Sequence, residues 1–180
     1  ETQRCKSIIQ GLLEFARDRK PQKVPANIND IMESALGIVE NEFRLRHVGL
    51  ERELAEGMVK TLLDENQIEQ VFINLLLNAV HAVEENGNVT VQSGVDSLHN
   101  KIQVEICDNG CGIASDDIKK IFEPFYSTKT KGTGLGLAVS YGIVKNHQGD
   151  IRVYSMPGKI TRFTIELPIR GENSSERRTP

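Results

Sequence analysis

The chain has 180 residues, of which 38% are hydrophobic, and this size and composition fit one globular domain with short appendages. It carries 22 Lys and Arg against 25 Asp and Glu, and the formal net charge of −3 excludes a general attraction to nucleic acid or to an anionic bilayer. Three cysteines without a CxxC pair argue against a disulfide framework, and the longest apolar run, around 73–77, is too short to cross a membrane. We therefore expect a soluble, cytoplasmic piece of protein in which any phosphate binding is local.

The first 19 residues have the periodicity of an amphipathic helix, with Arg and Glu on the side opposite the apolar stripe. Pro21 and Pro25 follow and end this helix. The last residues lack apolar side chains, which is typical of disorder. We predict three parts: an N-terminal helix with its linker at 1–24, a main domain at 25–169, and a disordered tail at 170–180.

Two helices are expected next, one at about 30–46 with Asn29 as its N-cap and one at about 65–85 with Asp64 as its N-cap. The Asn86–Gly87 pair favours the left-handed conformation of a helix C-cap and is expected to end the second helix. Apolar residues of this helix face inward. Two polar residues within it, at 74 and 78, are therefore anomalous.

Alternating residues then predict strands at 89–95 and 102–106, joined as a hairpin. A short helix at about 115–121, capped by Ser115, leads into a polar, glycine-containing stretch. A last helix at about 134–147 and a hairpin of strands, 150–155 and 162–167, turned at Pro157–Gly158, complete the domain. Together these elements predict an α/β (α+β) two-layer sandwich, a mixed five-stranded sheet covered on one face by three helices.

Asn74 and Asn78 lie four residues apart on one face of the predicted helix, so their side chains converge. A carboxamide oxygen suits Mg²⁺, which keeps several waters and completes its shell with substrate phosphates. We assign Asn78 as the metal ligand and expect Asn74 to hold a metal-bound water or a phosphate oxygen, because a carboxamide cannot act as a general base. For either asparagine alone, a hydrogen bond to backbone in a helix crevice is the more common explanation.

The sequence DNGCGI at 108–113 places a carboxylate at the end of a strand, before glycines that permit backbone conformations closed to other residues. Asp108 can accept the amino hydrogen of adenine. We expect Gly110 to permit the turn, Gly112 to let the backbone approach a flat base, and Ile113 to pack on that base. Taken alone, Asp-Asn-Gly is a common turn sequence with no such role.

In GTGLGL at 132–137, Gly134 and Gly136 open the last helix, whose unpaired N–H groups and positive dipole end can meet nucleotide phosphates. Thr133 adds a hydroxyl donor. Lys129 and Lys131 precede the motif and can reach a terminal phosphate, although one of them is expected to be only a solvated charge. Gly-x-Gly alone is weak evidence, but together with the asparagines and the carboxylate it predicts a site for ATP and Mg²⁺.

Four blocks in fixed order resemble the N, G1, F and G2 boxes of the ATP-binding catalytic domain of bacterial sensor histidine kinases: NLLLNA at 74–79, DNGCGI at 108–113, FEPFYSTK at 122–129 and GTGLGL at 132–137. These kinases are members of the GHKL superfamily, which has the Bergerat nucleotide fold. The resemblance covers about residues 25–168. Its short lid and the wording FYSTKTKGTGLGL are similar to the nitrogen-regulation type of sensor kinase.

The resemblance implies Mg²⁺ at Asn78, adenine at Asp108, a lid at about 109–133, and lid contacts from Phe122 and Phe125. The catalytic set that it implies is Asn74, Asn78 and Lys129. The nucleotide-binding set is Asn78, His81, Ala82, Asp108, Gly110, Gly112, Ile113, Phe122, Phe125, Lys129, Gly132, Thr133, Gly134, Leu135, Gly136 and Leu137. For His81, which lies one turn after Asn78, a plain position on the helix surface is the simpler alternative.

The N-terminal RCKSIIQGLLEFAR resembles the second helix of the family's dimerisation and phosphoacceptor hairpin, which implies a homodimer in the whole protein. None of the four histidines, His47, His81, His99 and His147, has the setting of the family's acceptor. We therefore expect this fragment to bind ATP without phosphorylating itself. The resemblance implies transfer to a histidine outside this sequence and then to a response regulator receiver domain, and it is compatible with a membrane anchor elsewhere in the whole protein.

Position 74 separates the alternatives. ATP-hydrolysing relatives such as gyrase, the mismatch-repair proteins and the heat-shock chaperones resemble this pattern but place a glutamate there to activate water, whereas this chain has an amide. The prediction is phosphoryl transfer to a protein histidine by positioning and charge neutralisation. A GHKL ATPase or a serine-type anti-sigma kinase is the second interpretation, and a nucleotide-gated interaction module without chemistry of its own is the third.

Overall fold

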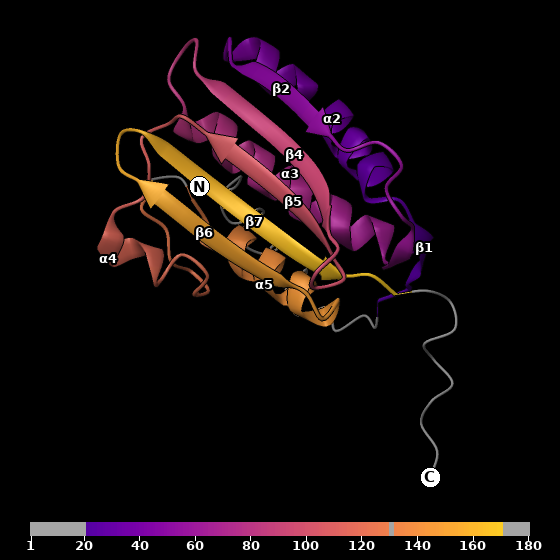
Figure 1. Cartoon of the computed structure of the whole chain (residues 1–180). Coiled ribbons are helices and arrows are strands. Elements are labelled where there is room, and N and C mark those ends of the chain that lie inside the picture. The colour runs from indigo at the N-terminus through magenta and orange to yellow at the C-terminus, as the bar shows by residue number, and fades with distance from the viewer. Residues whose placement is uncertain (1–20, 130–131, 171–180) are drawn as a thin grey trace, which may run out of the picture.

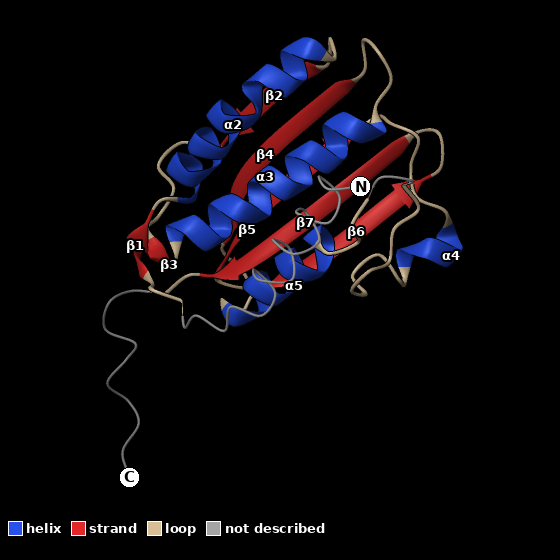
Figure 2. Cartoon of the chain, turned by 180° about the vertical axis from the view of Figure 1, so that it is seen from behind, coloured by secondary structure: helices blue, strands red, loops and turns tan. Residues whose placement is uncertain are grey.

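The computed structural model describes residues 21–129 and 132–170. One five-stranded sheet has the strand order β2-β4-β5-β7-β6, and the helices α2, α3 and α5 lie together on one of its faces (Figures 1 and 2). The predicted two-layer sandwich of a mixed sheet and three helices is therefore confirmed. No helix within these residues combines the length and apolar character that a bilayer-spanning segment requires. The predicted N-terminal helix and C-terminal tail lie outside the described residues.

The elements follow one another as β1 (Val24–Ala26), α2 (Ile28–Leu45), β2 (Gly49–Leu54), β3 (Thr61–Leu63), α3 (Glu65–Ala82), β4 (Asn88–Asp96), β5 (Lys101–Asp108), α4 (Ser115–Ile118), α5 (Gly136–Asn146), β6 (Asp150–Met156) and β7 (Ile160–Pro168). β2 pairs with β4 in parallel, and the other neighbours in the sheet are antiparallel. The two predicted hairpins are β4–β5 and β6–β7. β1, β2 and β3 were not predicted, because β1 and β3 have three residues each and β2, GLEREL, is a charged edge strand.

Helix α2 begins earlier than predicted, and the assignment of Asn29 as its N-cap is wrong. Asn27 caps the helix, and its side chain accepts a hydrogen bond from the N–H of Asn29 at 2.9 Å. Asn29 lies in the first turn, where its side chain donates to the carbonyl of Ala55 at 2.8 Å and accepts from Ser93 Oγ at 2.7 Å. Both residues are good N-caps by type, so a long-range contact decides between them.

Helix α3 begins at the predicted cap, because Asp64 accepts a hydrogen bond from the N–H of Gln67 at 3.1 Å. It ends at Ala82, short of the predicted end at 85, and the next residue is extended. Asn86, with φ of 64°, lies in a later turn and is not a C-cap of this helix. The carbonyl of Ala82 accepts from the N–H of Cys111 at 2.9 Å, which joins the end of the helix to the loop after β5.

The segment between β5 and β6 is less helical than predicted. α4 spans Ser115–Ile118 only, and Ser115 does not cap it, because Ala114 occupies the N-cap position without a side-chain hydrogen bond. α5 begins at Gly136 instead of Gly134. Gly134 has φ of 69°, a left-handed conformation that cannot be part of an α-helix and that glycine adopts readily. Gly134 therefore lies in the turn before α5, and Gly136 is the first residue of the helix.

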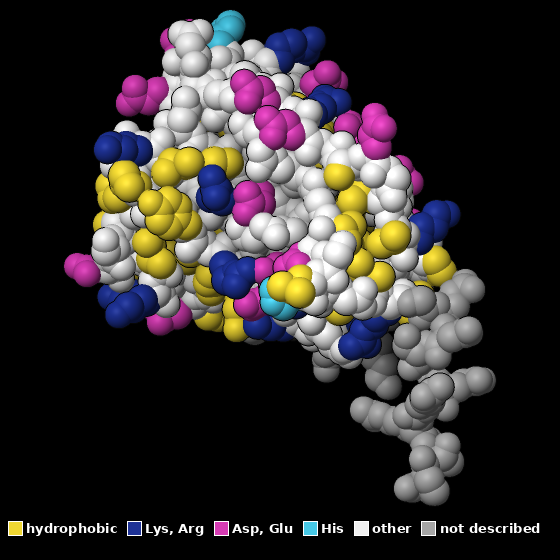
Figure 3. Space-filling view, viewed as in Figure 1, with side chains coloured by type: hydrophobic (Ala, Val, Ile, Leu, Met, Phe, Trp, Pro, Cys, Tyr) yellow, Lys and Arg dark blue, Asp and Glu magenta, His cyan; other side chains and the backbone are white. Residues whose placement is uncertain are grey.

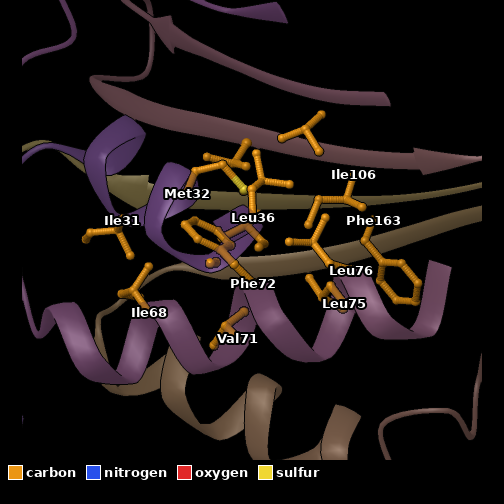
Figure 4. Packing of buried hydrophobic residues seen from close by; sticks show 14 of the residues in the cluster. Ile31, Met32, Leu36, Ile68, Val71, Phe72, Leu75, Leu76, Ile106 and Phe163 are labelled. Carbon is orange, nitrogen blue, oxygen red and sulfur yellow. The ribbon is translucent and has the colours of Figure 1, made fainter. Parts of the chain in front are cut away.

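The core fills the space between the sheet and the helices, and side chains of α2 and α3 interlock there (Figure 4). The largest fully buried side chains come from both helices, from the strands β5 and β7 of the sheet, and, in the case of Leu63, from β3: Phe72, Ile28, Met32, Leu36, Leu63, Ile68, Leu75, Leu76, Ile102, Ile106, Ile165 and Leu167. Burial of apolar surface stabilises by roughly 25 cal/mol per Å². This contact therefore fixes the rotation of α3 about its axis. It also decides which residues of α3 face away from the core and can contact a ligand.

The opposite face of the sheet carries interspersed basic and acidic side chains, with groups of hydrophobic side chains toward its sides (Figure 3). Glu166 on β7 lies between Lys101, at 2.7 Å, and Arg152, and the guanidinium of Arg162 lies 3.6 Å from Glu105. Exposed pairs of this kind contribute about 0–1 kcal/mol each. This face therefore adds little to stability, and the helix layer on the other side holds the core.

A buried histidine joins the start of α3 to the end of α5. The Nδ1–H of His147 donates to the carbonyl of Ile143 at 2.8 Å, and its Nε2 accepts from the backbone N–H of Asp64 at 3.0 Å. Burial lowers the pKa of His147 and Lys23 lowers it further, while the Ile143 carbonyl and Asp64 act in the opposite direction. The two hydrogen bonds require the neutral imidazole, because a protonated ring has no acceptor for Asp64.

Acid should therefore destabilise the fold through His147. Its pKa in the folded chain is below the ordinary 6.5, so the unfolded chain binds more protons and the free energy of unfolding falls as pH drops below that value. The loss is at most about 1.4 kcal/mol per pH unit. Urea unfolding between about pH 8 and about pH 5 measures it. The dependence of the unfolding free energy on pH should be weaker in His147→Gln and unchanged in His99→Gln, which alters an exposed histidine. The same pH dependence in the natural chain and in both variants would contradict the role of His147.

Candidate nucleotide-binding site

The predicted site residues come together where the second half of α3, the loop after β5 and the start of α5 meet. The Ala82 carbonyl of α3 accepts from Cys111 of the loop, and the Nδ2 of Asn74 donates to Ser140 Oγ of α5 at 2.9 Å. In Figure 2 this corner is at the end of α3 that faces α4. The structure therefore places the N-box, G1-box and G2-box segments around one corner of the helix layer.

Asn74 lies in the contact between α3 and α5. Its Nδ2 bonds to the buried hydroxyl of Ser140, and its Oδ1 lies only 2.3 Å from where a Cβ on Gly136 would stand. Glycine is needed at 136 because any side chain there would displace the Asn74 carboxamide. The nitrogen of that amide is already used within the protein, and the group cannot take a proton from water.

Asn78 has a different environment from Asn74. Its side chain is half-buried and has no hydrogen-bond partner among residues 21–129 and 132–170. Because the carboxamide is only half-buried, it can exchange hydrogen bonds with water for bonds to a ligand. Asn78 therefore has a free oxygen and a free N–H₂ group for a ligand. Ala82, one turn later, is also half-buried, and its carbonyl joins the loop after β5.

Asp108 ends β5 with a carboxylate that is 4% exposed. Its Oδ1 accepts from the backbone N–H of Gly110 at 3.0 Å. Burial raises the pKa of Asp108 to about 6, and the hydrogen bond from Gly110 and the charge of Lys129 limit this rise. A buried carboxylate with one bonded oxygen can accept a further hydrogen bond, such as one from an amino group of a bound base.

The loop after Asp108 is held on both sides. A Cβ on Gly110 would stand 2.3 Å from the Ala82 carbonyl oxygen, and a Cβ on Gly112, which has φ of 75°, would stand 2.6 Å from Pro157 Cα. Gly112 is therefore needed for contact with the β6–β7 turn, and its role toward a base stays a prediction. The N–H of Ile113 donates to Ser155 Oγ at 2.8 Å, and Ile113 is half-buried.

The two phenylalanines of the F box have different environments. The Phe122 ring packs against Tyr141 of α5 at 5.4 Å and against Phe163 of β7 at 6.5 Å between centroids. Phe125 is 62% exposed and has φ of 67°, which is rare for a residue with a side chain. Its N–H donates to the carbonyl of Gly134 at 2.9 Å. Phe122 therefore anchors the F box to the core, whereas Phe125 is presented to solvent.

The remaining lid residues lead to α5. Gly132 donates through its N–H to the carbonyl of Lys129 at 3.0 Å, and a Cβ on it would collide with Ser127 Oγ. Partial desolvation lowers the pKa of the Lys129 amine, Cys111 and Asp108 raise it, and Arg46 lowers it. Lys129 and Asp108 thus shift each other's pKa in the directions expected of opposite charges. Lys131, the other predicted lysine, lies outside the described residues.

Helix α5 begins without a side-chain cap, because its N-cap residue is the buried Leu135. Thr133 Oγ1 accepts a hydrogen bond from the N–H of Leu135 at 3.4 Å, just before the helix. Leu137 packs against the core. The N–H groups of the first turn therefore remain for solvent or for a ligand, and the helix dipole favours an anion there.

The His81 side chain is bonded to helix α2. Its Nε2 lies 3.3 Å from Glu42 Oε1 of α2, which also accepts from Arg46 Nε at 2.8 Å. Sequence reasoning did not identify Glu42, Arg46, Ser140 or Ser155 as part of the site's surroundings. Glu42, Ser140 and Ser155 contact site residues that are tens of residues away in the sequence, so no local pattern could have shown these contacts.

Comparison with protein families identifies the same region. Residues 63–171 match the family described as histidine kinase-, DNA gyrase B-, and HSP90-like ATPase, which is more than half of the chain. The catalytic domain of the histidine kinase ThkA superimposes with a TM-score of 0.74 at 30% identity, over 82% of this chain and 96% of that structure. ThkA in complex with the response regulator protein TrrA gives a TM-score of 0.80 at 26% identity, over 96% of this chain and 49% of that one.

Two curated relatives are similar along almost the entire chain. Sporulation kinase E of Bacillus subtilis is 37% identical over 179 residues, which is 99% of this chain and 24% of the relative. The signal transduction histidine-protein kinase AtoS of Escherichia coli is 40% identical over 167 residues, which is 93% of this chain and 27% of the relative. The chain thus spans about a quarter of the length of these proteins.

The contact of Gly112 with the β6–β7 turn predicts the effect of adding a methyl group. Gly57→Ala, at φ of 66° with no atom near its Cβ, should cost about 1 kcal/mol of unfolding free energy from the strained backbone alone. Gly112→Ala has the same strain and a collision with Pro157, so it should cost about 2–4 kcal/mol. Urea unfolding of the two variants measures the difference. Equal losses would show that the close approach is unimportant.

Proposed function

The chain belongs to the histidine kinase-, DNA gyrase B-, and HSP90-like ATPase family, as an ATP-binding catalytic domain of sensor histidine kinases, and on this basis we propose how its residues perform the reaction. The adenine amino group donates to the free oxygen of Asp108. The phosphates lie against the start of α5 and beside Asn78, where the helix N–H groups and the lid lysine Lys129 supply positive potential. Three segments that the structure joins at one corner supply these groups, which supports the assignment.

Mg²⁺ fits the same place. Asn78 has the oxygen donor that this ion prefers, and its carboxamide has no protein partner within the described residues. We assign Asn78 as its protein ligand, with phosphate oxygens and water completing the shell. When bound, the ion neutralises charge on the phosphates. The other lid and loop residues of the predicted set, Ile113, Phe122, Phe125 and Thr133, then enclose the nucleotide without taking part in chemistry.

The observation that favours phosphoryl transfer over hydrolysis is the amide at position 74. Asn74 is bonded to Ser140 and packed against Gly136, so no carboxylate stands there to activate water. We propose that catalysis rests on positioning and charge neutralisation, with a histidine of another helix as the acceptor. Hydrolysis of ATP, or transfer to a serine, would need a base that this position does not supply.

The whole protein is proposed to work as a homodimer through the helix that the sequence predicts for residues 1–19, with 25–169 as the catalytic domain. The phosphate would pass to a response regulator receiver domain, as the complex of the similar kinase ThkA with TrrA suggests. The sequence of the F and G2 boxes, FYSTKTKGTGLGL, supports a nitrogen-regulation-like subtype. A place in the cytoplasm follows from the need for ATP.

Labelled ATP tests the proposal directly. With Mg²⁺ and ATP labelled at the terminal phosphate, the chain should hold intact nucleotide, release little phosphate and acquire no stable label. Asp108→Asn should weaken binding by about ten- to hundredfold, because it replaces a charge-assisted hydrogen bond. Asp96→Asn, at the remote end of β4, is the matched control and should bind normally. Steady release of phosphate would favour the ATPase interpretation, and binding that is equal in both variants would refute the site.

The raised pKa of Asp108 gives a second test. The carboxylate accepts the adenine hydrogen bond in its ionised form, which predominates above its pKa of about 6. Affinity for adenosine, which lacks titrating phosphates, should therefore fall by up to about tenfold per pH unit below that value. Asp108→Asn binds weakly but should show no such dependence in titrations followed by NMR. A flat profile for the natural chain would contradict the role of the carboxylate.

A further inference from the structure

A charged cluster borders the site on the side of α2. Glu42 and Arg46 lie one turn apart on this helix, and Glu42 Oε1 accepts from Arg46 Nε at 2.8 Å and from His81 Nε2 at 3.3 Å. Glu42 and Arg46 are outside the four sequence blocks. The cluster therefore joins a helix without a recognised role in the site to the helix that carries Asn78.

Backbone contacts fix the position of this cluster relative to the site. The ends of α2 and α3 are joined where the N–H of Asn86 donates to the carbonyl of His47 at 3.2 Å, and Ala82, next to His81, holds the loop that follows Asp108. Arg46 is the C-cap of α2, where the negative end of the helix dipole favours a cation. The guanidinium thus belongs to a rigid element and is linked to His81 through Glu42.

The exposed fractions of the side chains indicate which part of a nucleotide this charged cluster would contact. Asp108 is 4% exposed, whereas the side chains of His81 and Arg46 are 38% and 45% exposed. A base bound at Asp108 lies deep, so its phosphate tail has to lead outward. Burial lowers the pKa of His81, and the charges of Arg46 and Lys129 lower it further, while Glu42 raises it. Glu42 is the acidic member of this cluster, and its carboxylate accepts hydrogen bonds from the other two members, Arg46 and His81.

We propose that Arg46 binds the phosphate tail of the nucleotide together with His81, and that Glu42 holds both donors in the empty site and yields them to phosphate. This inference rests on the proposed function, because it requires a nucleotide with its base at Asp108. A phosphate oxygen offers the guanidinium the same geometry as a carboxylate, so the exchange keeps the donors paired. Glu42 then acts as a competitor that lowers affinity for phosphate.

ADP and adenosine separate this role from a structural one. Arg46→Gln should weaken ADP binding by about three- to tenfold and leave adenosine binding unchanged, because only the phosphates are affected. Arg46→Lys should keep part of the ADP affinity. Arg44→Gln is the matched control, since Arg44 lies on another side of the same helix and its side chain, within the described residues, bonds to Asn41 at 2.8 Å. Equal ADP affinities for Arg46→Gln and Arg44→Gln would overturn the proposal.

Glu42→Gln tests the second half of the proposal. Without the competing carboxylate, ADP should bind about two- to fivefold more tightly. Weaker binding would show that Glu42 does not compete with phosphate. The two levels of failure are distinguishable: if the natural chain binds ADP no better than Asp108→Asn does, the proposed function fails. If Asp108 matters and Arg46 does not, only this inference fails.

Discussion

The site depends on how α3 packs. This helix buries seven apolar side chains against the sheet and its neighbouring helices, Ile68, Val71, Phe72, Leu75, Leu76, Ala79 and Val80. With that much surface committed, the helix cannot rotate without exposing apolar groups to water. The residues on its remaining side are thereby fixed in direction, and they include Asn74, Asn78, His81 and Ala82. Hydrophobic packing, which is itself non-directional, thus positions the polar groups to within one face.

Electrostatics then distinguishes the positions along this face. Asp108 is buried deeply enough that its ionised form is costly, and in the empty protein the N–H of Gly110 and the charge of Lys129 offset only part of that cost. A ligand that donates a hydrogen bond to the carboxylate gains from this poor solvation, whereas one without a donor does not. Asn78 has the complementary condition, a polar group without a protein partner among the described residues. The site therefore favours a ligand that bonds to both groups.

Local signals in the sequence predicted much of this structure. Asp64 caps α3 as expected, and the turn at Pro157–Gly158 gives the β6–β7 hairpin, because both features depend on a few adjacent residues. Asn27 and Asn29 could not be ranked as caps, since a contact with Ala55 and Ser93 decides between them. The early end of α3 likewise depends on a hydrogen bond with Cys111, which is remote in sequence.

The candidate site shows the same division. The order of the motifs identified the motif residues of the site. It did not reveal the close contact that requires glycine at 112, because a side chain there would collide with Pro157, which is remote in sequence. The partners Ser140, Ser155 and Arg46 belong to other elements and have no motif of their own. A sequence block shows that a side chain is present, whereas the fold decides whether its hydrogen-bonding groups are free. That is why Asn74 and Asn78, which are equivalent by spacing, differ in the structure.

The polar contacts between α3 and α5 explain how the phosphate end of the site is held. These helices are joined at two points: Asn74 with Ser140 near the start of α5, and Asp64 with His147 at its end. Residues ahead of β1 reach the second point, where Gln22 N–H donates to Asp64 Oδ2 at 2.8 Å and Lys23 Nζ to the Asn146 carbonyl at 2.8 Å. Because both ends of α5 are tied to α3, the direction of its first N–H groups relative to Asn78 does not depend on the lid. The lid needs only to enclose a nucleotide whose phosphate-binding groups are already in place.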